Sequence, residues 1–176
     1  MKLKRIMMFV AAATMLFAAC GKDDDKSTPT AADNQLVYNG KVYQAEGAEG
    51  NVNSNNAQLG FSGEKDGIFF MVECHIQDVA NRTYDLTQED ADHVLHFHIV
   101  VEGPAVQSQE DIFDLQYQNG PHLWYFLNGN NVSNASAFTS GTAETTLTDT
   151  SLILSVSGTL VNGKSLAFRV VLPRED

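Results

Sequence analysis

The sequence predicts an all-β protein: a single antiparallel β-sandwich or an up-and-down (calycin-like) barrel of about ten short strands. Two observations support this prediction. Apolar and polar residues alternate in one short segment after another, as in strands with one buried face. Asn-Gly dipeptides, the strongest short-range signal for a two-residue hairpin turn, lie between β-prone segments at Asn39-Gly40, Asn119-Gly120 and Asn162-Gly163. Periodicity alone does not choose between sandwich and barrel.

The first 19 residues have the three parts of a secretory signal peptide. Basic residues at Lys2, Lys4 and Arg5 precede an apolar stretch over 6–17, and small residues follow it. A membrane-spanning helix needs about 20 apolar residues, which is more than this stretch provides. We therefore expect a cleaved signal at 1–19.

The end of this signal, Phe17-Ala18-Ala19-Cys20, resembles the lipobox of bacterial lipoproteins, with Phe17 in place of the usual leucine. The resemblance implies that a lipid is attached to the Cys20 thiol and that cleavage occurs just before it. An ordinary cleaved signal with an incidental cysteine is the alternative. Each buried methylene contributes about 0.8 kcal/mol, so several acyl chains would hold the protein far more firmly than one.

The residues after the cysteine are acidic. Lys22, Asp23, Asp24 and Asp25 resemble the export signal that moves Bacteroidetes lipoproteins to the outer face of the outer membrane. This resemblance implies a lipid-anchored protein facing the cell exterior. A solvated tether is the plainer interpretation, and both can hold, because residues 21–35 contain no large apolar side chain. We expect Cys20 and the acidic tether to occupy 20–35.

The remaining segment, 36–176, has the length of one globular domain. Residues 1–19 hold three of the 11 basic residues and none of the 22 acidic ones, so cleavage leaves eight against 22, a net charge of −14. This charge argues against nucleic acid as a partner. Apart from the lipid anchor, the expected partners are a glycan or a surface protein.

Ten segments of the domain have the composition or alternation of strands. Within the first, Asn39-Gly40 makes a hairpin turn, and the last two form the clearest antiparallel pair. Ser108 to Asp111 also resembles a helix capping box. The predicted strands are 36–45, 57–63, 67–76, 82–86, 93–102, 111–118, 122–128, 138–147, 151–160 and 165–172.

Two Asn-Gly-Lys hairpins, at 38–41 and 161–164, give the domain a resemblance to the small β-domains of unknown function found in Bacteroidetes lipoproteins. The resemblance implies no active-site residue. Catalytic motifs such as Gly-x-Ser-x-Gly, His-Glu-x-x-His and Cys-x-x-Cys do not occur in the sequence. Cys74 alternates with apolar residues, which predicts a buried, inert thiol. We therefore expect a protein that is not an enzyme and has no catalytic residues.

One predicted strand is apolar on both faces. His122, Trp124 and Phe126 share one face, while leucine and tyrosine residues occupy the other. Either this strand is central and covered on both sides, or the face with Trp124 is a platform for a sugar ring or an apolar ligand.

A second constellation would suit a metal. His96 and His98 oppose the apolar residues of their strand, and Glu73 and His75 do the same in an earlier strand. If the two strands pair in the right register, three imidazoles and a carboxylate meet on one surface, a set that suits zinc or copper. The sequence does not determine that register, and solvated side chains are the alternative. No other cofactor is expected.

Three functions follow from these observations. A surface-tethered, non-catalytic binding or accessory module agrees with the predicted location at the cell surface and with the aromatic strand. A lipocalin-like carrier of a small apolar ligand would need a closed barrel with a cavity. A hydrolase would need a cleft with perturbed carboxylates.

Overall fold

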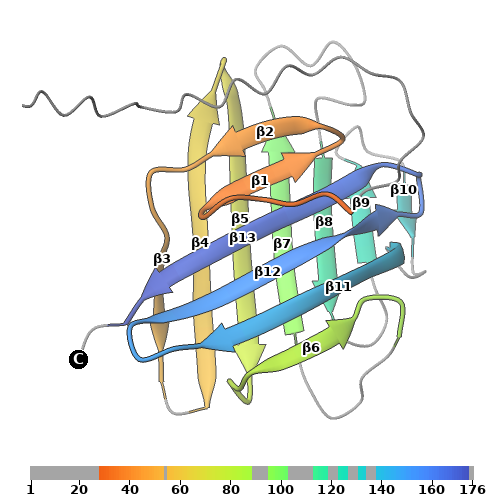
Figure 1. Cartoon of the computed structure of the whole chain (residues 1–176). Coiled ribbons are helices and arrows are strands. Elements are labelled where there is room, and N and C mark those ends of the chain that lie inside the picture. Colours follow the sequence, from red (N-terminus) through yellow and green to blue (C-terminus); the bar gives the residue numbers. More distant parts are fainter. Residues whose placement is uncertain are drawn as a thin grey trace, which may run out of the picture.

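The computed structural model describes residues 28–53, 55–88, 95–102, 113–118, 123–126, 131–133 and 138–174. Within these residues the chain forms thirteen strands and no helix, in two antiparallel sheets that face each other (Figure 1). The all-β prediction is confirmed, and the architecture is a sandwich. In the described ranges, no strand ladder joins one sheet to the other to close a barrel.

The six-stranded sheet has the order β2-β1-β13-β12-β11-β6. Its long C-terminal strands cross the other sheet obliquely (Figure 1). Its members are β1 (Gln35–Tyr38), β2 (Lys41–Gln44), β6 (Arg82–Asp85), β11 (Phe138–Leu147), β12 (Ser151–Leu160) and β13 (Ser165–Pro173).

The seven-stranded sheet has the order β10-β9-β8-β7-β5-β4-β3. The edge strands β3 and β10 were not among the predicted segments, and the capping-box region leads into a strand, β8. The members are β3 (Glu49–Val52), β4 (Asn56–Lys65), β5 (Ile68–Gln77), β7 (Leu95–Glu102), β8 (Phe113–Gln118), β9 (Leu123–Phe126) and β10 (Asn131–Ser133).

Aromatic and branched side chains fill the space between the sheets. Phe97 of β7 is fully buried, and its ring meets Phe168 of β13 edge-on, with ring centroids 5.1 Å apart. It also meets Phe138 of β11 at 6.2 Å, again edge-on. Edge-to-face contacts of this kind stabilise a core beyond the area they bury. The two sheets are therefore joined by apolar contacts around Phe97.

The turns follow the sequence signals in part. Asn39 and Gly40 both have left-handed backbone (φ 48° and 77°) and Tyr38 pairs with Lys41, so the predicted two-residue turn is confirmed. At Asn162-Gly163 the prediction was wrong, since the loop spans 161–163. Gly163 N–H donates to the Leu160 carbonyl (2.8 Å) and only the glycine needs left-handed backbone (φ 80°). Asn119-Gly120 lies outside the described residues.

The turn at Asp66-Gly67 was not among the predicted turns. Asp66 and Gly67 both have positive φ (56° and 77°) and join β4 to β5, with Lys65 paired to Ile68. Asp-Gly is as strong a hairpin signal as Asn-Gly, so the sequence contained this information. The turn determines how β4 and β5 align.

Residues 1–27, including the predicted signal peptide, the lipidated cysteine and the first part of the tether, lie outside the described residues. The part of the chain that the structure describes contains no helix long and apolar enough to span a membrane.

Candidate functional site

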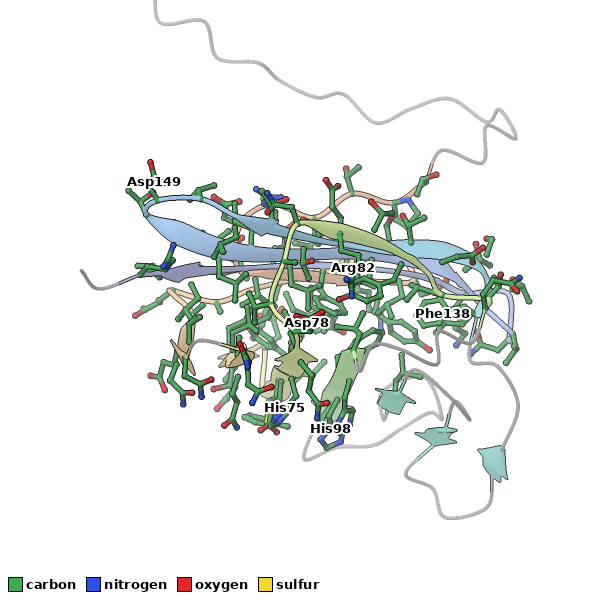
Figure 2. The ribbon with its side chains drawn as sticks, turned by 90° about the horizontal axis from the view of Figure 1, so that it is seen from below. His75, Asp78, Arg82, His98, Phe138 and Asp149 are labelled. Carbon is green, nitrogen blue, oxygen red and sulfur yellow. The ribbon has the colours of Figure 1, made fainter. Side chains whose placement is uncertain are left out.

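The pairing of β5 with β7 brings four predicted site residues together. Glu73 lies opposite His98, and His75 lies opposite His96. Between these pairs, Cys74 lies opposite Phe97 and both are fully buried, so the neighbouring positions face outward. Figure 2 shows His75 and His98 projecting from the seven-stranded sheet, away from the six-stranded one. We call Glu73, His75, His96 and His98 the histidine cluster.

Direct contacts connect the cluster. His75 Nε2 lies 3.2 Å from Glu73 Oε1, and the His75 and His96 rings stack with centroids 5.6 Å apart and planes 23° from parallel. Gln58 on β4 donates from its side-chain amide to Glu73 Oε1 at 2.8 Å. The His75 and Glu73 side chains are 45% and 39% exposed, so solvent reaches the cluster. The site therefore spans three adjacent strands.

The carboxylate of the cluster favours its ionised form. The hydrogen bond from Gln58 is the main cause that lowers the pKa of Glu73, and His75 lowers it further. Partial burial opposes this shift. Glu73 is therefore a carboxylate at neutral pH, able to accept hydrogen bonds or bind a cation.

His96 favours its neutral form. Burial lowers the pKa of His96, the charges of His75 and His98 act in the same direction, and Glu73 opposes them. Its Nε2 atom is buried and has no hydrogen-bond partner among the described residues. A buried ring nitrogen without a partner is costly, so this atom is a candidate contact for something that the structure does not contain.

The cluster does not form a ready metal cage. With the side chains oriented as they are, no three histidine, cysteine, aspartate or glutamate groups of the described ranges could hold one ion. The predicted residues are thus brought together, and metal binding remains a prediction.

A groove of about 1030 Å³ lies beside the cluster, between the segment 44–51, which leads into β3, and residues of β4 and β5. Its lining includes Gly60, Ser62 and Met71. Gln58 and Glu73 line the groove and also contact each other, so groove and cluster form one continuous surface. Sequence reasoning missed Gln58, although its polar position in the predicted strand 57–63 indicated an exposed side chain.

The buried position predicted for Cys74 is confirmed. Cys74 is a free thiol, fully buried, and burial raises its pKa well above the ordinary value. A protonated, inaccessible thiol is a poor nucleophile.

The other predicted site residues lie where the structure gives no side-chain description. Cys20, the export signal at 22–25 and His122 are outside the described residues. Trp124 and Phe126 belong to β9, of which only the backbone is described; this strand lies between β8 and β10. Both alternatives for this strand, a ligand platform and a covered core strand, stay predictions.

Comparison of the chain with models of protein families, with curated proteins and with solved structures gave no match.

Proposed function

We propose that this chain is a lipid-anchored outer-membrane protein facing the cell exterior, and that its β-sandwich is a non-catalytic module that binds glycans. The binding surface is the outer face of the seven-stranded sheet. One observation carries the second half of the proposal: the groove and the histidine cluster share Glu73, and Gln58 of the groove hydrogen-bonds to that carboxylate, so the two form one surface.

The chemistry of this surface suits sugars. The Gln58 amide and the Glu73 carboxylate supply donors and acceptors at fixed positions, since they already hydrogen-bond to each other. Phe69, on the same face of β5, is 40% exposed and offers an apolar ring. Binding sites commonly combine apolar surface with a few well-placed polar groups of this kind.

The alternative functions have less support. A carrier of an apolar ligand would need an enclosed apolar cavity, whereas the described inner positions are filled by packed side chains such as Phe70 and Phe97. A hydrolase would be favoured by a carboxyl group whose pKa is raised, and the pKa of Glu73 is lowered.

A glycan array tests the binding surface. The double variant Gln58→Ala with Glu73→Gln should lose at least about ten-fold in affinity for the glycans bound by the wild type. Gln58→Ala removes an amide that can hydrogen-bond, and Glu73→Gln removes the negative charge that strengthens the hydrogen bonds of the carboxylate. Glu144→Gln is a matched control, because this exposed residue lies on the other sheet. Unchanged binding by the double variant would contradict the assigned surface. If no glycan binds and a protein is captured instead, the partner class is wrong.

The proposed location rests on the lipobox-like segment from Phe17 to Cys20 and on the export-signal residues. Cys20→Ala should release the protein from the membrane fraction, because the acyl chains have no other attachment point. Protease treatment of intact cells should remove the domain, with a periplasmic protein as the protected control. A domain that stays intact while a known surface protein is cut would contradict the exterior location.

A further inference from the structure

We propose that the histidine cluster binds a divalent transition metal, with zinc as the ion that its ligand types suit best. Zinc is held by imidazole nitrogen and carboxylate oxygen, most often with four ligands in a tetrahedron. Three histidines and one glutamate provide that set. The proposal concerns the surface assigned above but does not depend on glycan binding.

The strand register places the four ligands. His75–His96 and Glu73–His98 are successive cross-strand pairs on the same face. Directly opposite residues in an antiparallel ladder lie about 4.5 to 5.5 Å apart at Cα, and residues two apart along a strand lie about 7 Å apart. The ligands thus start from the corners of a small rectangle, above which their side chains can meet.

Two of the rings lie close enough together to share an ion once their side chains rotate. Two imidazoles bound to one tetrahedral zinc, with nitrogen at about 2.0 to 2.1 Å from the metal, have ring centroids about 5 Å apart. The His75 and His96 centroids are 5.6 Å apart. The two ring planes are only 23° from parallel, so their nitrogens do not converge on one point, and binding requires both side chains to rotate toward the ion.

A bound ion would give new contacts to two parts of the cluster. His75 Nε2 and Glu73 Oε1 are 3.2 Å apart, and a cation between β5 and β7 would take this pair as ligands in place of their mutual contact. His96 Nε2, which has no partner within the described ranges, would gain one. Rotation of His75 is inexpensive because its side chain is 45% exposed.

Surrounding groups favour a cation. The chain carries a net charge of −11, which attracts metal ions over long range. Gln58 holds Glu73 Oε1 through its amide at 2.8 Å and so orients the carboxylate from outside the ligand set. Partners of this kind typically change metal affinity 10- to 100-fold.

Calorimetric titration of the full chain tests the proposal. The protein, purified in detergent and stripped of metal with EDTA, should bind one zinc ion per chain with a Kd below about 10 µM. His75→Ala and His96→Ala should each weaken binding at least about ten-fold, and Gln58→Ala should weaken it less. Glu144→Gln, a carboxylate change on the other sheet, should leave the affinity unchanged. Urea unfolding of each variant checks that the fold is intact.

Histidine side-chain NMR provides a second readout. Zinc should shift the imidazole signals of His75, His96 and His98 together, with a single saturation point. Absence of heat and of shifts, or zinc binding that survives the combined His75→Ala and His96→Ala change, would overturn the proposal. Glycan binding measured in EDTA separates the two hypotheses: if it persists when zinc does not bind, the metal proposal alone has failed.

Discussion

Replacing Phe97 by alanine should strongly destabilise the sandwich. The ring is fully buried and lies edge-on to Phe168 and Phe138 at centroid distances of 5.1 and 6.2 Å. Transfer of the ring to water costs about 1.5 to 3 kcal/mol, and each edge-to-face contact adds about 0.5 to 1.5 kcal/mol. Together these terms predict a loss of about 2.5 to 6 kcal/mol, which brackets the usual range of about 3 to 5 kcal/mol for this substitution in a core.

Urea unfolding followed by tryptophan fluorescence and far-UV circular dichroism measures the loss. Since small domains are stable by only about 5 to 15 kcal/mol, Phe97→Ala should remove a large part of the total. The control is Phe69→Ala on the neighbouring strand, where the side chain is 40% exposed on the outer face. This change should cost about 1 kcal/mol.

Equal losses for the two variants would refute the reasoning, because the same side chain would then contribute equally inside and outside. A loss below about 1 kcal/mol for Phe97→Ala would show that the sheets are not joined through this ring. In either case the assignment of the inner and outer faces of β5 and β7, on which the histidine cluster depends, would fail.

Two further predictions follow from local geometry. Gly40→Ala should cost about 1 to 2 kcal/mol in urea unfolding, since φ is +77° and the surrounding space is open; Gly47→Ala, also in open space but without left-handed backbone, should be neutral or slightly stabilising. Burial lowers the pKa of His96, so the folded chain binds fewer protons than the unfolded one just below the ordinary value of 6.5. Stability of the metal-free chain should therefore fall as the pH drops through that value, and His96→Gln should reduce the fall. An identical pH dependence of stability in the wild type and in His96→Gln would contradict this prediction.

The alternation in β5, β7, β12 and β13 predicted which residues face the core. Leu95, Phe97 and Ile99 are fully buried as expected, and His96 and His98 lie on the other face. The Asn39-Gly40 turn was also predicted, because asparagine and glycine tolerate the positive φ that this turn needs. Both signals are local: side-chain direction depends on position within a strand, and turn type depends on which residues tolerate positive φ.

The pairing of distant segments was not predictable. The strand that follows β5 in the sequence, β6, lies in the six-stranded sheet and pairs with β11. The neighbour of β5 in its own sheet is therefore the next strand along the chain, β7. This partner choice places His75 opposite His96 across 21 residues of sequence. No local preference of either strand specifies it.

The sequence by itself determined the all-β class, the faces of the main strands and the residues available for a site. Only the tertiary structure decided that the strands form an open sandwich, and that Glu73 and His75 lie opposite His98 and His96. The physical reason is the range of the interactions: alternation reports burial one residue at a time, whereas register is selected by the packing of whole sheets, since a shift by one residue would turn the apolar face of β7 toward water.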